Sequence, residues 1–229
     1  MICKFFVFRH AETTDNAQMI FSGWRDPILT PKGFLQAEEI AEQLKNEEIS
    51  YAFTSHLKRA RMTLEIVMKK HSYVPIFVDD RLIERCYGLL QGKSKKQIAT
   101  MKPEWFAEIH RGYETPPPEG ESLKMVENRT LPFLTELKEW LRDKHGNVAI
   151  SCHGNSMRPI RRVFEHLSLK QMLQIENPQD KAVTYVLHLH EAQIESSKMK
   201  FDKTDWKGIL LPRRIKLATD PRNSLKKYY

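Results

Sequence analysis

The chain has 229 residues, of which 41% are hydrophobic and 29% charged, enough for one sizeable buried core. Its apolar runs fall far short of the roughly 20 residues that a membrane-spanning helix needs, so an integral membrane protein is excluded. The apolar run near the N-terminus lacks a small-residue cleavage site, and we expect a buried strand there, not a signal peptide. Three widely spaced cysteines form no disulfide framework and no CxxC pair, which favours a reducing, cytoplasmic location.

The net charge of +8 is concentrated at the C-terminus. Residues 196–229 contain ten Lys or Arg and three Asp, a charge of +7, so the rest of the chain is nearly neutral. The simplest interpretation of this segment is a solvated basic tail. The alternatives are attraction of an anionic substrate, or binding to nucleic acid or to a membrane surface.

The first half of the chain alternates strand and helix patterns. Residues 2–8 form an apolar run that predicts a buried strand. Thr30 and Pro31 are an N-cap and a first-turn proline, and apolar residues recur after them at helical spacing. Residues 51–54 predict a second strand, and residues 57–68 predict a helix with one apolar face.

The second half continues the alternation. Residues 75–78 predict a short strand, and residues 121–144 a long helix interrupted by a proline. A strand is expected at residues 148–152, with a helix at 156–166 directly after it. Residues 182–190 are rich in β-branched and aromatic side chains and predict the last strand.

Strands that alternate with helices predict an α/β sandwich around a mostly parallel sheet. Residues 80–120 are poorer in strand patterns, and we expect them to form a cap over one edge of the sheet. The proline run at 116–118 indicates a loop and not a domain boundary.

Polar side chains follow three of the predicted strands at the point where each strand ends. Arg9 and His10 follow the first, a Thr-Ser-His-Leu-Lys-Arg run ending at Arg59 follows the second, and His153 follows the strand at 148–152. Ligands of open α/β sheets bind at the carboxyl ends of the strands. Guanidinium groups and helix N-termini bind phosphate there, so these exits predict a phosphate site.

Other candidates have simpler interpretations. Single histidines are more often packed or exposed than functional, and we interpret His56, His71, His110 and His166 in this way. His188 and His190 lie on one face of the last strand, but a metal site there would lack a third ligand. Cys86 and Cys152 are expected to be small buried residues, and the Arg161–Arg162 pair to be a solvated helix face.

Six separated blocks of sequence resemble one known family in its order. They are RHAETTDN, FSGWRDPILTPKG, TSHLKRARMT, RLIERCYGLLQG, PEGESL and SCHGNSMR. Together they are similar to the histidine phosphatase superfamily, and most similar to its 2,3-bisphosphoglycerate-dependent phosphoglycerate mutase branch. The resemblance covers roughly residues 3–188.

The resemblance implies a three-layer α/β/α sandwich with a central mixed sheet, no metal, and phosphoryl transfer through a phosphohistidine. It implies that His10 is the nucleophile and Glu84 the general acid and base, while Arg9, Arg59 and His153 bind the transferring phosphoryl group. The remaining matched positions lie around the phosphate and the substrate: Asn16, Ser22, Gly23, Tyr87, Lys95, Arg111, Gly154 and Asn155. A catalytic domain at residues 1–195 followed by a basic tail at 196–229 is the expected organisation.

Roles of this kind agree with elementary chemistry. An uncharged imidazole is a good nucleophile at neutral pH, and cationic donors stabilise the charge that phosphoryl transfer spreads over oxygen. Glu84 would protonate the leaving alkoxide, whereas its structural alternative is a salt bridge with Arg81 or Arg85.

Two departures from the mutase pattern move the chain toward related phosphatases. The segment between the proline run and Ser122 is short, and His110-Arg111 stands where the mutases usually have two arginines. Against this, HGNSMR, ERCYG and Lys95 are mutase-like, since they offer amide, hydroxyl and cationic partners to a carboxylate-bearing substrate.

The sequence therefore predicts a metal-independent phosphoglycerate mutase with no bound prosthetic group and with 2,3-bisphosphoglycerate as primer. The alternative is a phosphomonoester phosphatase with the same chemistry. Two weaker alternatives are a catalytically idle scaffold and a nucleic-acid-binding module. The presence of every residue needed for catalysis argues against the first, and the second rests on the basic tail alone. The expected partner is a small phosphorylated substrate, with no nucleic acid and no membrane, and a homo-oligomer stays open.

Overall fold

The computed structural model describes residues 2–188 and places a five-stranded sheet at the centre of the chain. The strands lie in the order β3-β2-β4-β1-β5, and β5 alone runs antiparallel, against β1. Their bounds are β1 Ile2–Arg9, β2 Tyr51–Thr54, β3 Ile76–Val78, β4 Val148–Cys152 and β5 Ala182–His188. The predicted mostly parallel mixed sheet is confirmed.

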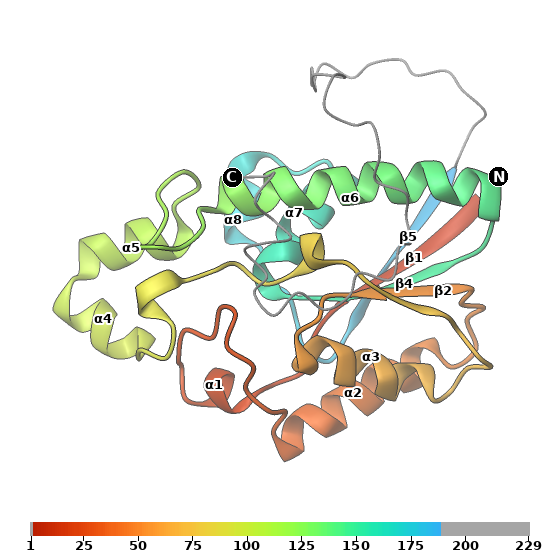
Figure 1. Ribbon diagram of the computed structural model, residues 1–229, viewed down its shortest axis with the longest axis horizontal. Helices are drawn as coiled ribbons and strands as arrows, with labels where there is room; N and C mark the ends of the chain where they lie inside the picture. The colour runs from red at the N-terminus through yellow and green to blue at the C-terminus, as the bar shows by residue number, and fades with distance from the viewer. Residues whose placement is uncertain (1, 189–229) are drawn as a thin grey trace.

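Helices cover both faces of this sheet (Figure 1). Along β1 the side chains alternate: Phe6 and Phe8 pack with α2 (Pro31–Leu44) and α3 (Lys58–Met68), whereas Phe5 and Val7 pack on the other face. That second face is covered by α6 (Leu123–Lys144) and α7 (Gly154–Phe164). A strand buried on both faces explains why β1 contains an unbroken apolar run at residues 5–8.

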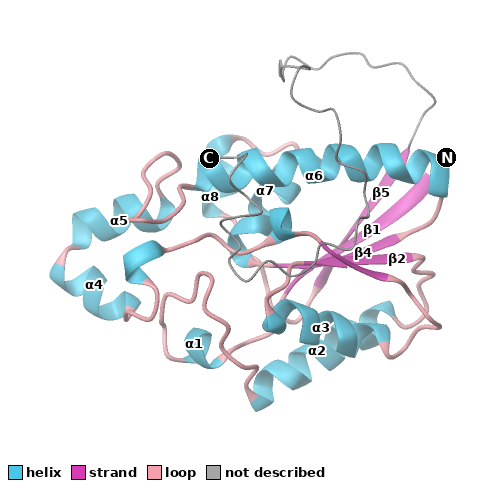
Figure 2. Cartoon of the chain, viewed as in Figure 1, coloured by secondary structure: helices cyan, strands magenta, loops and turns pink. Residues whose placement is uncertain are grey.

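Several shorter helices complete the fold. Figure 2 distinguishes helices from the strands of the sheet by colour. α4 and α5 form a pair beyond the sheet, packed around a small apolar cluster that contains Phe21, Tyr87 and Ile109. Their position fits the expected cap at residues 80–120, while the division into domains stays a prediction. The short elements are α1 Thr14–Ala17, η1 Asp80–Leu82, η2 Gly88–Leu90, α4 Lys95–Met101, α5 Pro103–Arg111 and α8 Leu169–Gln174.

Local signals set most helix starts. Thr30 accepts a hydrogen bond from the Gly33 amide at 3.0 Å, which confirms the predicted cap. The helix expected at 156–166 instead begins at Gly154 and ends at Phe164. His153 is its N-cap residue, and the His153 amide donates to Ser156 Oγ at 3.1 Å. α6 begins at Leu123 behind the capping hydroxyl of Ser122, two residues later than expected.

One surface interpretation is wrong. Arg161 and Arg162 are not a solvated face: Arg161 pairs with Glu165 on its own helix, and Arg162 pairs with Glu127 of α6 at 2.8 Å. Of the helices that are described, none is both long and apolar enough to cross a membrane. Residue 190 and the basic tail lie outside the described residues.

Candidate active site

Three strand exits meet at one rim of the sheet. β4 lies between β1 and β2, so the residues after these strands are neighbours. His10 and His153 approach to 5.0 Å between ring centroids, and Arg59, in the first turn of α3, donates from Nε to His10 Nε2 at 3.2 Å. The convergence predicted from the strand exits is thus present in the structure.

A pocket of about 530 Å³ opens at this rim. Eleven of the thirteen predicted site residues line it: Arg9, His10, Asn16, Ser22, Gly23, Arg59, Glu84, Tyr87, Lys95, Gly154 and Asn155. His153 is fully buried directly behind them. Arg111 ends α5, and its side chain is outside what the structure describes.

The hydrogen bonds of His10 select its tautomer. Nδ1 lies 2.8 Å from the Ala11 carbonyl oxygen, which only accepts, so Nδ1 carries the proton. Nε2 therefore keeps its lone pair and accepts from Arg59. Burial, together with the nearby Arg59 and Arg9 guanidinium groups, holds the pKa of His10 well below its usual value of 6.5. His10 is therefore a neutral imidazole at neutral pH, with Nε2 as the nucleophilic atom.

Arg59 is fixed before any ligand arrives. Its Nη1 and Nη2 donate to the carbonyl oxygens of Arg25 and Gly23, at 2.6 and 2.8 Å. Gly23 has φ +52°, and a Cβ there would meet the Gln91 side chain, so this turn requires glycine. Burial lowers the pKa of Arg59 to about 10, which still leaves it charged at neutral pH.

Two buried nitrogen atoms near His10 have no hydrogen-bond partner in the described part of the protein. Arg9 Nε has no hydrogen-bond partner within residues 2–188, and neither does His153 Nδ1. The opposite ring nitrogen of His153 is 2.8 Å from Ser55 Oγ. Buried polar atoms without partners are uncommon and mark places where a ligand binds. An anion between Arg9, Arg59 and His153 would satisfy both atoms.

Glu84 lies across the pocket on the loop between η1 and η2, and only 7% of it is exposed. Its Oε1 accepts three hydrogen bonds, from the Arg85 amide at 2.8 Å, the Asn155 amide at 3.1 Å and Asn155 Nδ2 at 3.0 Å. Three donors on Oε1 leave Oε2 as the oxygen that can carry a proton.

The salt-bridge alternative for Glu84 is not what the structure shows. Arg81 pairs with Asp79 and Glu136, and the Arg85 guanidinium donates to backbone carbonyl groups, one of them that of Glu121. Glu84 is thus held by neutral donors and faces the pocket.

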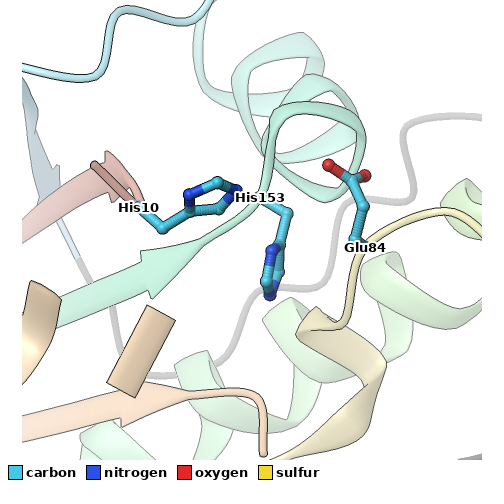
Figure 3. A group of neighbouring side chains, drawn as sticks. All are labelled: His10, Glu84 and His153. Carbon is cyan, nitrogen blue, oxygen red and sulfur yellow. The ribbon is translucent and has the colours of Figure 1, made fainter. Parts of the chain in front are cut away.

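His10, Glu84 and His153 come from three separate segments and point toward a common space (Figure 3). One donor atom from each lies within 4.8 Å of the others, a spacing that a metal ion could bridge. Arg9 and Arg59 border the same space, and their positive charge opposes a divalent cation while favouring a phosphoryl group. The charges therefore fit an anion better than a metal.

The cysteines are not candidates for the nucleophile. Cys152 is fully buried in β4, and burial, reinforced by the charge of Glu84, raises the pKa of its thiol to about 12. Cys86 is also buried, with its Sγ packed against Gln91 and Glu119. Both fit the prediction of small buried residues.

The sequence interpretation missed part of the pocket wall: Met19, Lys96, Ala99, Phe106, Arg158, Glu176 and Asn177. His110, which we interpreted as packed or exposed, also lines it. Asn177 orients the centre directly, because its carbonyl accepts from Arg9 at 3.3 Å and its Nδ2 donates to Gly154. Asn177 precedes β5, and the loop before an antiparallel strand returns to the carboxyl end of β1, but the sequence holds no signal for the direction of β5.

Fold and site together define an α/β protein in which a neutral histidine lies between two arginines at a pocket, an arrangement suited to an anion. The model of the histidine phosphatase superfamily (branch 1) matches residues 5–202, and the chain belongs to that superfamily. Its members are enzymes, mutases or phosphatases.

Relatives and solved structures fall on both sides of that division. The chain is 32% identical over 206 residues to a 2,3-bisphosphoglycerate-dependent phosphoglycerate mutase of Chlamydia trachomatis serovar L2, covering 78% of this chain and 91% of that protein. It is 37% identical over 190 residues to the Nitrobacter winogradskyi enzyme of the same name, covering 79% and 89%.

Among solved structures, Bacillus stearothermophilus YhfR has a TM-score of 0.70 at 27% identity, covering 80% of this chain and 90% of that chain. A mycobacterial glucosyl-3-phosphoglycerate phosphatase has a TM-score of 0.71 at 22% identity, covering 82% and 92%, and supports the fold alone.

Proposed function

We propose that this chain interconverts 3-phosphoglycerate and 2-phosphoglycerate through a phosphohistidine at His10, with 2,3-bisphosphoglycerate as primer. The observation that carries the proposal is the neutral His10 Nε2 beside two buried nitrogen atoms, Arg9 Nε and His153 Nδ1, that have no hydrogen-bond partner among residues 2–188. The names of the curated relatives support the mutase reaction over other phosphoryl transfers.

In the first step, His10 Nε2 attacks phosphorus and the bond between phosphorus and the substrate oxygen breaks. Glu84 Oε2 gives its proton to the leaving alkoxide, while Oε1 stays fixed by its three donors. Arg9, Arg59 and His153 stabilise the charge on the phosphoryl oxygens. In the enzyme primed in this way, the free hydroxyl group of 3-phosphoglycerate gives its proton to Glu84 and takes the phosphoryl group from His10, which forms 2,3-bisphosphoglycerate. Return of the other phosphoryl group to His10 then leaves 2-phosphoglycerate.

Residues farther along the pocket would hold the rest of the substrate. Lys95 begins α4 behind the cap of Ser94, and its ammonium group lies 5.6 Å from the centre of the Phe21 ring. Tyr87 Oη is 3.2 Å from Asn155 Nδ2. We assign the carboxylate of phosphoglycerate to Lys95 and to the backbone of Ser22 and Gly23. Asn16, Tyr87, Gly154 and Asn155 would surround the ester oxygen. The substrate contact of Arg111 stays a prediction from the sequence.

A second candidate is a phosphomonoester phosphatase, and the outer wall of the pocket favours it. Phe106 and His110 stack at 4.8 Å with an interplanar angle of 16°, where the mutases usually present arginine. A pocket of about 530 Å³ also exceeds what a three-carbon acid fills. An aromatic wall that does not clamp the substrate would let water reach the phosphohistidine.

The product ratio decides between the two candidates. The purified protein receives 3-phosphoglycerate with a catalytic amount of 2,3-bisphosphoglycerate, and both 2-phosphoglycerate and inorganic phosphate are measured. The mutase proposal expects 2-phosphoglycerate as the main product, accompanied by slower phosphate release. Glycerate and phosphate without 2-phosphoglycerate would rule out the mutase and leave the phosphatase.

A further inference from the structure

A fully buried ion pair lies directly behind the loop that carries Glu84. Arg129 in α6 and Glu121 just before that helix have 0% and 1% of their surfaces exposed. Arg129 Nε and Nη2 donate to the two oxygens of Glu121 at 2.8 and 3.1 Å, a bidentate geometry. Neither residue lines the pocket.

Arg129 holds the loop before Glu84 and at Glu84 itself. Its Nη1 donates to the Arg81 carbonyl at 2.8 Å, and its Nη2 donates to the Glu84 carbonyl at 3.1 Å. Trp24 Nε1 donates to the same Glu84 oxygen at 2.7 Å. The backbone of Glu84 itself is therefore held by two side chains from distant parts of the sequence.

Glu121 holds the loop on the C-terminal side. Its Oε2 accepts from the Cys86 amide at 2.7 Å, and its own amide donates to the Cys86 carbonyl at 2.9 Å. Residues 83–87 have no helix or strand to define their shape. Instead, four hydrogen bonds from Arg129 and Glu121 hold this loop, at the carbonyl groups of Arg81 and Glu84 and at the amide and carbonyl groups of Cys86. The ion pair between Arg129 and Glu121 keeps these contacts at a constant spacing.

We infer that Arg129 and Glu121 are positioning residues for the proton transfer of Glu84. The inference rests on the proposed role of Glu84. A buried ion pair is weak support for stability, since well-packed apolar residues often serve a fold equally well. A general acid, by contrast, works only within hydrogen-bond reach of the leaving oxygen, and small displacements are costly there.

The test compares two substrates that differ in their need for an acid. The p-nitrophenolate group leaves without a proton, whereas the alkoxide of benzyl phosphate requires one. Arg129→Lys keeps the charge but loses the bidentate bond and at least one carbonyl contact. We expect kcat/KM for benzyl phosphate to fall at least about 10-fold more than kcat/KM for p-nitrophenyl phosphate. Glu121→Gln should show the same selectivity, and it keeps the test available if Arg129→Lys does not fold.

The control is Arg162→Lys. Arg162 in α7 pairs with Glu127 in α6, and this ion pair does not contact the loop that carries Glu84. The control variant should lower the stability and leave the ratio of the two kcat/KM values unchanged. A double variant with Glu84→Gln completes the cycle: once the acid is absent, Arg129→Lys should cause no further selective loss.

The two failures are distinguishable. If Glu84→Gln itself affects both substrates equally, the proposed acid role of Glu84 is wrong. If Glu84→Gln is selective but Arg129→Lys and Glu121→Gln reduce both substrates equally, the pair is structural and the positioning inference is overturned.

Discussion

The two buried histidines should make the stability of the folded chain fall steeply below neutral pH. Burial is the main cause that holds the pKa values of His10 and His153 well below 6.5, and Arg59 adds to it at both. In the unfolded chain each imidazole takes up a proton near pH 6.5, whereas in the folded chain it does not. Protons therefore favour the unfolded state, so stability is complete above about pH 7 and is lost as the pH falls through 6.5.

The magnitude follows from the protons bound by the unfolded state alone. Between pH 7.5 and 5.5 each histidine that stays neutral in the folded chain should cost about 1.4 kcal/mol, so the pair costs about 2.7 kcal/mol. His10→Asn keeps a donor near the Ala11 carbonyl and removes one titrating group. This variant should lose about 1.4 kcal/mol less than the wild type over the same interval.

Equilibrium urea unfolding at both pH values, in phosphate-free buffer, measures these free energies. His71, whose pKa is lowered by burial, contributes equally to both proteins and cancels in the comparison. Equal losses in wild type and His10→Asn would mean that folded His10 protonates like an exposed imidazole. The neutral-nucleophile argument would then be refuted.

Three further predictions address the site. His10→Ala should abolish both turnover and the transfer of labelled phosphate to the protein, where the wild type forms an acid-labile, base-stable adduct; undiminished labelling would place the nucleophile elsewhere. Arg9→Lys should lower kcat/KM by about 10²-fold, because lysine lacks the Nε donor that faces the transferring group; a loss below threefold in steady-state assays would contradict that role. Deleting the residues after Lys200 should raise KM for anionic substrates and weaken its dependence on salt, since the tail beyond residue 195 carries +7; unchanged KM values at low and high salt would leave the tail without a part in substrate attraction.

The catalytic rim was predictable because its residues directly follow strands. A buried strand has a clear apolar pattern, and the residues at its carboxyl end must lie at that rim of the sheet. Arg9 ends β1, and His10 and His153 directly follow β1 and β4. The parallel pairing of β1 and β4 then fixes their proximity. Nothing in this reasoning requires knowledge of a family.

Glu84, Tyr87 and Lys95 could be identified only through the resemblance to the histidine phosphatase superfamily. Glu84 and Tyr87 lie on a loop whose shape depends on Arg129 and Glu121, more than 30 residues away, and no local periodicity encodes such contacts. Asn177 was missed for a related reason. Its role depends on the antiparallel placement of β5, and the sequence pattern of a strand does not reveal its direction.

The centre and the outer wall of the pocket have different roles in the proposed reaction. In the proposed mechanism Arg9, Arg59 and His153 bind the phosphoryl group that His10 accepts, and these roles are the same in a mutase and in a phosphatase. The fate of the phosphohistidine depends instead on whether water or a retained hydroxyl reaches it first. We propose that Lys95 and the Phe106–His110 stack, which lie on the cap and line the pocket, determine this competition. Variants of the cap should therefore change the ratio of 2-phosphoglycerate to phosphate, whereas variants of the rim should change both rates together.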